Sequence, residues 1–238
     1  ATLAGVTGAR GTLLETLTWE QAESRLTPTT VVVLPIGARA KEHGPHLQLD
    51  NDWRIAEYFK AFVLAEADVV VAPTLAYHHY PAFFEYPGST SLRLETARDV
   101  VVDICVSLAR HGPRRFYALN TGVSTVKALA PAAELLAAHG ILLTFTRLEA
   151  TGAAVAAVSE QEGGTHADEI ETSMMLVIAP ETVAMDKAVK DYDPRPLPGL
   201  SRQPDAGRSY SPTGIYGDPT LATRAKGEAV VSARKRQI

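Results

Sequence analysis

Four short runs of apolar, mostly β-branched residues constrain the fold of this chain most strongly. The runs cover residues 31–37, 69–73, 115–119 and 141–145. Runs of this kind are typical of strands that are buried on both faces, as in parallel sheets. The segments between them repeat apolar side chains at helical spacing, from residue 52, from about residue 96 and over about residues 126–138. Strands that alternate with helices predict an α/β fold with three layers, in which helices cover both faces of a mainly parallel sheet of at least four strands.

The length and composition fit one folded unit. The chain has 238 residues, of which 46% are hydrophobic and 21% charged, as in ordinary globular proteins. We therefore predict a single domain over residues 1–238. Residues 1–28 are expected to form an N-terminal extension and a helix. Residues 191–220 are rich in proline and glycine and are expected to form an irregular but ordered loop, at the site or at a subunit contact.

Charge and cysteine content exclude several classes of protein. A formal net charge of -4 gives no broad basic surface for nucleic acid, and the basic run 234–236 is expected to be a solvated tail. The single cysteine, Cys105, allows no intrachain disulfide and lies on the inward face of a predicted helix. No apolar run approaches the roughly 18 to 20 residues of a membrane span, so no membrane partner is expected. The cytoplasm is the default location. A secreted or periplasmic location stays open because the chain starts at Ala1 rather than at methionine.

Polar side chains gather where the predicted strands end. Open parallel sheets bind ligands beyond the carboxyl ends of their strands, and imidazole and carboxylate groups are ligands that zinc, manganese and iron prefer. A single histidine in such a place is more often structural, but the cluster as a whole favours a metal site. Its members are Glu42, His43, His46, Asp52, Asn120 and Thr121, followed later in the chain by His166, Asp168 and Glu169.

Four motifs in the same order resemble those of the creatininase (creatinine amidohydrolase) family. Residues 34–37 read L-P-I-G, and residues 43–47 read H-G-P-H-L, with an acidic residue six positions beyond the second histidine. Residues 86–92 resemble the family's F-P-G-T-x-S-L, and residues 166–173 resemble H-A-G-E-x-E-T-S. Residues 217–227 resemble its C-terminal signature. The motifs span roughly residues 30 to 228, so the chain resembles a divergent member of this family.

The resemblance implies a creatininase-like fold and a metal-dependent amidohydrolase. Such an enzyme cleaves a carbon–nitrogen bond of a small cyclic or linear amide with a metal-activated water. Zinc is the favoured ion, manganese and iron are alternatives, and one or two ions are expected. The family is commonly oligomeric, so a homo-oligomer is expected, with a hexamer as a frequent form.

The resemblance also implies roles for individual residues. His43 and Asp52 match family metal ligands, and Asp52 would bridge two ions where two are bound. Glu169 matches a position whose carboxylate can complete the metal site. His166 matches a histidine that acts in proton transfer. The stretch from Gly37 to His43 is one residue longer than is usual in the family, and Glu42 would be a further ligand and catalytic group if this extra residue forms a bulge.

Two departures from the family pattern bear on the number of ions. Lys41 stands where the family usually has a glutamate, and Gly122 stands where it commonly has a histidine ligand. One of two metal sites is then either lost or rebuilt from Glu42, His46 or Glu85. These departures also support the alternative function, a non-catalytic family member that serves as a binding or assembly subunit.

A loop with five aromatic residues, 77–88, follows the second predicted strand and is expected to border the substrate. Its aromatic rings favour a flat or apolar substrate, or alternatively a subunit interface. A hydroxyl nucleophile at Ser124 is disfavoured because the G-x-S-x-G pattern is absent. The residues predicted to contact substrate are His46, Tyr77, His78, Glu85, Asn120 and Thr121.

Overall fold

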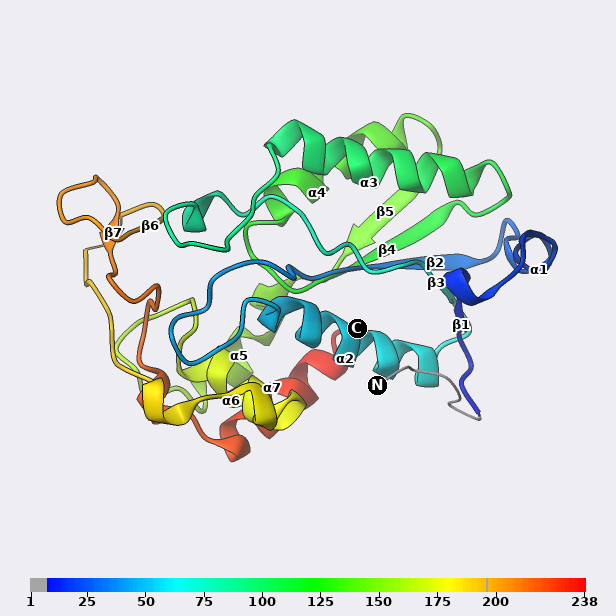
Figure 1. Ribbon diagram of the computed structural model, residues 1–238. Helices are drawn as coiled ribbons and strands as arrows, with labels where there is room; N and C mark the ends of the chain where they lie inside the picture. The colour runs from blue at the N-terminus through cyan, green and yellow to red at the C-terminus, as the bar shows by residue number, and fades with distance from the viewer. Residues whose placement is uncertain (1–7, 196) are drawn as a thin grey trace.

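Five parallel strands form the central sheet of the computed structural model, which describes residues 8–195 and 197–238 (Figure 1). The strand order is β1-β3-β2-β4-β5. The strands are β1 (Thr12–Leu13), β2 (Val31–Ile36), β3 (Val70–Val71), β4 (Arg115–Asn120) and β5 (Leu142–Phe145). All four predicted strands are present, although β3 is shorter than its apolar run, and β1 was not predicted. The mainly parallel sheet is thus confirmed.

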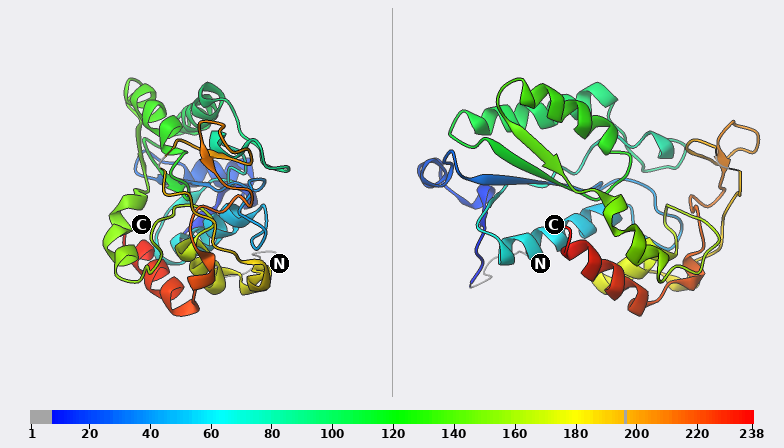
Figure 2. Two further views of the ribbon diagram at one scale, coloured as in Figure 1. Left: turned by 90° about the vertical axis from the view of Figure 1, so that its left-hand side faces the viewer. Right: turned by 180° about the vertical axis from the view of Figure 1, so that it is seen from behind.

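Helices cover both faces of this sheet, as Figures 1 and 2 show. One face carries α3 (Leu94–Ala109) and α4 (Val126–Ala137). The other carries α2 (Asn51–Glu66), α5 (Gly152–Ala156), α6 (Glu169–Ile178) and α7 (Arg224–Lys235). Helix α1 (Trp19–Arg25) precedes β2 and begins with a capping box at Thr18. Short 3-10 helices cover Leu14–Thr16, Pro81–Phe83, Leu148–Thr151, Pro180–Thr182, Met185–Lys187 and Pro219–Leu221.

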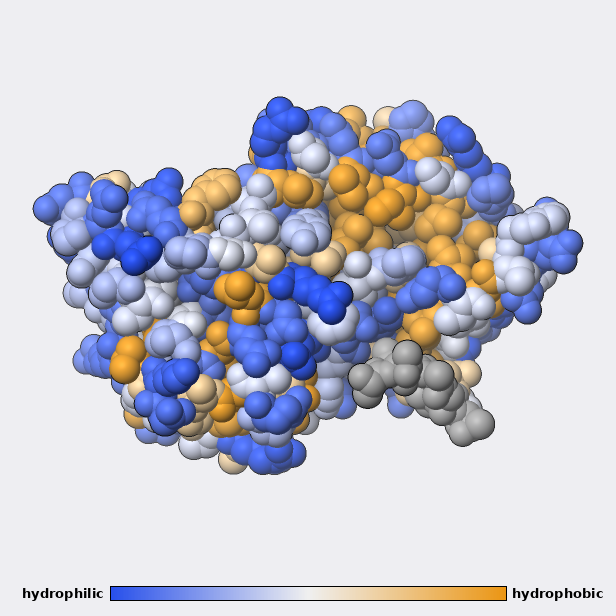
Figure 3. Space-filling model, in the orientation of Figure 1, coloured by the Kyte–Doolittle hydropathy of each residue, from blue (hydrophilic) through white to orange (hydrophobic). Residues whose placement is uncertain are grey.

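The alternation of side chains along β2 builds a core on each face. Val33 packs into a cluster that includes Ile55 of α2, whereas Val32 packs into a second cluster on the opposite face. That second cluster contains Cys105, which is fully buried as expected for a packing residue. Partly buried apolar side chains pack at the edge of this second cluster. Figure 3 shows apolar side chains gathered below α3 on the face in view.

Close packing of α6 against α7 depends on Gly227. A Cβ atom at this position would overlap the carbonyl oxygen of Ser173. The missing side chain therefore lets the two helix backbones approach each other. Because α6 carries part of the site described below, this contact helps to fix the position of that site.

The N-cap of α2 is Asp50, and Asp52 lies in the first turn with its side chain turned to the loop after β2. One sequence expectation needs correction. The basic run 234–236 is not a solvated tail, because it ends α7, where Lys235 lies over the Tyr58 ring. Of the predicted N-terminal extension, residues 1–7 lie outside the described residues.

The proline- and glycine-rich segment is only slightly more regular than expected. Within residues 191–220, two-residue strands β6 (Leu200–Ser201) and β7 (Ser209–Tyr210) pair in parallel. They lie beside the aromatic loop at one end of the molecule (Figure 1). No helix among residues 8–195 and 197–238 is long and apolar enough to cross a membrane.

Candidate metal centre

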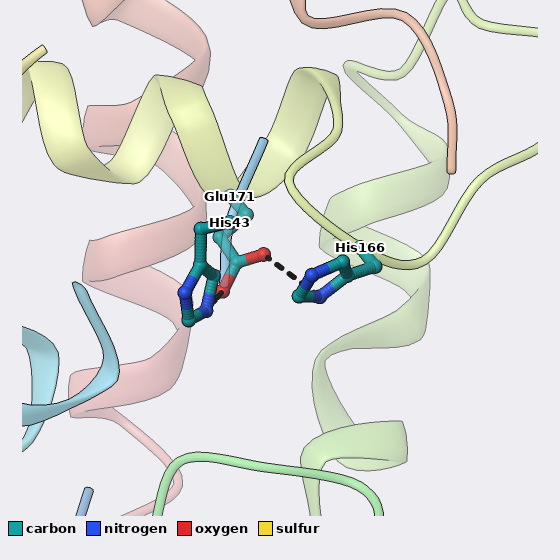
Figure 4. A group of neighbouring side chains, drawn as sticks. All are labelled: His43, His166 and Glu171. Carbon is teal, nitrogen blue, oxygen red and sulfur yellow. Dashed lines mark ion pairs between the residues drawn. The ribbon is translucent and has the colours of Figure 1, made fainter. Parts of the chain in front are cut away.

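Two imidazoles and one carboxylate converge at the carboxyl end of the sheet (Figure 4). His43 comes from the loop after β2, His166 from the segment before α6, and Glu171 from the first turn of α6. One possible ligand atom from each lies within 4.8 Å of the others. Both histidines are buried, whereas the Glu171 side chain is 20% exposed.

Contacts of the His43 ring fix which nitrogen carries the proton. Nδ1 lies 2.9 Å from the carbonyl oxygen of Lys41, which can only accept, so Nδ1 donates. Nε2 then faces two further acceptors, Asp52 Oδ1 at 2.9 Å and Glu171 Oε1 at 3.5 Å. Burial opposes a charge here, but the carboxylates of Asp52 and Glu171 together outweigh it and raise the pKa of His43 to about 10. The Nε2 position therefore demands either a proton or a cation between ring and carboxylates.

The His166 ring is also oriented by hydrogen bonds at the nitrogen that points away from Glu171. Its Nε2 lies 2.7 Å from Glu42 Oε1 and 3.0 Å from the Glu42 carbonyl oxygen, so it donates to Glu42. The other nitrogen, Nδ1, faces Glu171 Oε2 at 3.9 Å, the ion pair drawn in Figure 4. The Phe83 ring lies against the imidazole, with centroids 4.3 Å apart. A histidine whose outer nitrogen donates to a carboxylate or carbonyl is the usual arrangement of a metal ligand.

The start of α6 explains why Glu171 points at the histidines. Asp168 is the N-cap and accepts from the backbone N–H groups of Ile170 and Glu171. Glu171 is the third helical residue, a position from which a glutamate folds back over the helix start. Its Oε2 accepts from the backbone N–H of Ala167 at 2.8 Å. Ala167 itself has a φ of 49°, a strained value for a residue with a side chain, so this turn is held against its intrinsic preference.

The Glu42 side chain points into the site, but it is not one of the three possible metal ligands. Its carboxylate accepts from His166 Nε2 and, at 2.8 Å, from the backbone N–H of Gly44. Burial raises the pKa of this carboxyl, but the interaction with His166 outweighs burial and the net shift is downward. Gly214, with a φ of 85°, covers it, and a Cβ atom there would overlap the carboxylate. Glu42 is therefore held in one position as the partner of His166.

Lys41 points into the site rather than away from it. Its Nζ lies 2.6 Å from Asp52 Oδ2, and the two residues are 5% and 2% exposed. The ammonium also lies 4.9 Å from the centroid of the Phe83 ring and 5.4 Å from that of Tyr80. Burial raises the pKa of the Asp52 carboxyl, but the charges and hydrogen bonds of Lys41 and His43 together outweigh it and hold that pKa far below its usual range. Asp52 is thus shared by His43 and a buried lysine.

Glu169, the expected ligand, lies apart from the donor group. Its carboxylate binds Lys226 Nζ at 2.5 Å and accepts from the backbone N–H of Gln161 at 2.8 Å. The carboxylate that reaches the histidines is Glu171, two residues later in the chain. The capping pattern Asp168-x-x-Glu171 is the sequence signal that could have identified it.

The other predicted site residues have structural partners. His46 Nε2 lies 2.8 Å from the Thr172 hydroxyl, and the Asn120 side chain closes the turn around Gly122 with two hydrogen bonds. The Thr121 hydroxyl donates to the Ile36 carbonyl at 2.9 Å, and Glu85 accepts from the Ser201 hydroxyl at 2.8 Å. Tyr77 is 53% exposed on the aromatic loop. Substrate contact by these residues stays a prediction.

His78 is buried to 1% exposure, and neither ring nitrogen has a hydrogen-bond partner among the described residues. Burial, aided by His79, lowers the pKa of His78 to about 4. An unfolded histidine takes up its proton near pH 6.5. Between these values the unfolded chain binds more protons, so stability falls as the pH falls. We expect a loss of roughly 1–3 kcal/mol from this residue between pH 6.5 and 4.

Urea unfolding of wild type and His78→Phe at several pH values tests this expectation. The variant should lose less stability on acidification, because it removes the proton uptake that the unfolded state gains. His139→Phe is the matched control, since His139 is exposed and its loss should leave the pH dependence unchanged. Equal slopes for wild type and His78→Phe would contradict the expectation.

A cavity at the other end of the sheet lies away from this chemistry. Its volume is about 440 Å³, and it opens near the starts of β2, β4 and β5, at the opposite edge of the sheet. Its lining is largely apolar and includes Val31, Phe62 and Leu142. None of the three donors borders it.

The donor group fits one divalent cation. Two nitrogens whose outer partners are fixed, together with a carboxylate, form a donor set suited to zinc, manganese or iron. Around it, the carboxylates of Glu42, Asp52 and Glu171 face a single close ammonium, that of Lys41. The fold and this group together define an α/β protein with a candidate centre for a divalent metal at the carboxyl ends of its strands.

Comparison with known proteins identifies the family. The family model described as "Creatininase: Creatinine amidohydrolase" matches residues 15–238. The mycofactocin precursor peptide peptidase of Mycolicibacterium smegmatis is 33% identical over 208 residues, which cover 84% of this chain and 79% of that protein. The creatinine amidohydrolase of Pseudomonas putida is 28% identical over 244 residues, 90% of each chain. A solved mutant creatininase of the Zn-Zn type aligns over 94% of each chain at 25% identity, with a TM-score of 0.76.

The chain therefore belongs to the creatininase family and is a hydrolase that acts on carbon–nitrogen bonds of amides. Membership confirms the three-layer fold predicted from the sequence. The zinc form of the related structure, together with the His43, His166 and Glu171 group, supports a divalent metal in this chain.

Proposed function

We propose that this chain hydrolyses an amide bond with one divalent ion held by His43, His166 and Glu171. The observation that carries the proposal is the orientation of the two imidazoles. Each donates from its outer nitrogen, His43 to the Lys41 carbonyl and His166 to Glu42, and turns its other nitrogen toward Glu171. Without a cation or an extra proton, that arrangement would set unshared electron pairs of nitrogen against a carboxylate in a buried site.

The surrounding carboxylates have distinct roles in this proposal. Asp52 accepts from Lys41 Nζ and, in the metal-free protein, from protonated His43 Nε2, so that a bound ion would take the place of that Nε2 proton. A bound divalent ion would polarise the amide carbonyl and make a water molecule more acidic. Glu42 Oε1 accepts from His166 Nε2 at 2.7 Å and so keeps the other ring nitrogen, Nδ1, turned toward the ion site. In this proposal His166 acts as a ligand rather than in the proton-transfer role expected from the resemblance.

The substrate is proposed to be a small amide or a short peptide. Glu171 is the partly exposed member of the donor group, so substrate would approach from its side. Phe83 lies over His166 and excludes water from the opposite side. The relative named as a peptidase supports a linear peptide, and the creatinine amidohydrolase supports a small cyclic amide. Zinc is the favoured ion, with manganese and iron as alternatives, and a homo-oligomer stays a prediction.

Metal analysis of the purified protein tests this function. We expect about one equivalent of a transition metal per chain, and a chelator should remove it together with hydrolysis of a panel of creatinine, formyl amides and short peptides. Adding back zinc or manganese should restore hydrolysis. His43→Ala should bind no metal at the same free concentration, whereas His139→Ala, at an exposed position, should bind as wild type does. Metal-free protein that ignores added zinc, manganese and iron would contradict the proposal.

A further inference from the structure

The ammonium of Lys41 lies against a buried carboxylate, where a metal cation could also bind. It is buried, lies 2.6 Å from Asp52 Oδ2, and shares that carboxylate with His43 Nε2. Two aromatic rings, Tyr80 and Phe83, face it from the other side. A carboxylate bridged between an imidazole nitrogen and a second positive centre is a geometry that a pair of metal ions would also satisfy. Here the Lys41 ammonium, a cation that is part of the chain, occupies one of the two cation positions beside Asp52.

The charges around the site favour one divalent ion and disfavour two. Glu42, Asp52 and Glu171 contribute three negative charges, and Lys41 contributes one positive charge. The remaining two negative charges equal the charge of a single divalent ion. A second divalent ion would leave a buried excess of positive charge beside the Lys41 ammonium, which is strongly unfavourable in a region of low dielectric constant.

Neighbouring charges do not change this balance. Asp168 and the buried guanidinium of Arg234 add one charge of each sign beneath the site. Glu169 is neutralised by Lys226. The related solved creatininase is, by contrast, described as a Zn-Zn type.

We propose that Lys41 replaces one metal ion of a two-ion centre, so that this chain binds a single divalent ion and uses the lysine ammonium as its second cation. This inference rests on the proposed function, because the ion in question is the one held by His43, His166 and Glu171. Lys41 is a positioning residue in this scheme: it holds Asp52, which in turn holds His43.

The test counts bound zinc per chain in the full-length protein by equilibrium dialysis and elemental analysis. Wild type should bind one ion. Lys41→Glu replaces the ammonium with the carboxylate that the family usually has here, beside Asp52, so it should bind two. Lys41→Arg keeps a cation and should bind one. Lys60→Ala is the matched control, because Lys60 is equally buried but pairs with Glu15 and Glu57 outside the site, and it should bind one.

The outcomes separate this inference from the proposed function. Two ions in wild type, or one ion in both wild type and Lys41→Glu, would overturn the role of Lys41 while leaving a metal-dependent hydrolase. No ion in wild type but one in Lys41→Glu would support Lys41 as a cation substitute and overturn the proposed function. No ion in either protein would overturn both. If Lys41→Glu fails to fold without metal, refolding with and without zinc gives the same readout, since recovery only with zinc supports the replacement.

Discussion

Glu171→Gln is expected to weaken divalent-metal binding by more than about 100-fold and to lower kcat/KM for amide hydrolysis by about 1000-fold. The change preserves the size of the side chain and removes its charge. Glu171 faces both histidines, with Oε1 3.5 Å from His43 Nε2 and Oε2 3.9 Å from His166 Nδ1. Because it is the only carboxylate of the three-donor group, its charge is the main attraction for a cation there. Zinc titration and steady-state kinetics measure the two effects.

Glu169→Gln is the matched control. It lies on the same helix, two residues earlier, and its carboxylate is paired with Lys226 rather than with the histidines. It should lose stability, since Lys226 loses its buried partner and keeps only the exposed Glu160, but its affinity for metal should stay within about 3-fold of wild type. Equal losses of metal affinity in Glu169→Gln and Glu171→Gln would contradict the assignment. Loss only in Glu169→Gln would restore the ligand that the family motif had suggested.

The sequence predicted the fold well because burial on both sheet faces leaves a strong pattern. The runs that became β2, β4 and β5 are apolar at nearly every position, and the helices between them repeat apolar residues at helical spacing. The strand β1 was missed because two residues carry no periodic signal. The C-terminal basic run was misjudged because α7 is recognised by its packing on α6 rather than by its charge.

The site was predicted in outline but not in its contacts. His43, Asp52, Glu42 and His166 do come together, as the spacing after the first strand and the later histidine motif suggested. Two outcomes depend on three-dimensional geometry that no motif encodes. The backbone before α6 turns Glu171, rather than Glu169, toward the imidazoles, and the loop after β2 brings Lys41 onto Asp52.

Asp52→Asn is expected to lower the free energy of unfolding of the metal-free protein by about 3–5 kcal/mol. Asparagine keeps the shape of the side chain, so no cavity forms. The loss arises because Lys41 keeps its buried charge without a counter-charge, and because His43 Nε2 loses the acceptor that favours its protonated form. Urea unfolding in the presence of a chelator measures it. Asp68→Asn breaks an ion pair in which Asp68 is 70% exposed, and it should cost less than about 1 kcal/mol.

Combining Asp52→Asn with Lys41→Met separates the charge from other effects of the substitution. If the cost of Asp52→Asn comes from a stranded ammonium, removing that ammonium should recover most of it, and the double variant should be more stable than Asp52→Asn alone. The two single losses would then exceed the combined loss by at least about 2 kcal/mol. Additive losses would mean that Lys41 and Asp52 stabilise the fold independently. That result would contradict the proposal that the Lys41 ammonium serves as the second cation of the site. Strong coupling would instead explain why a buried lysine is stable in a metal centre. When only one ion binds, the Lys41 ammonium supplies the positive charge that balances the buried Asp52 carboxylate.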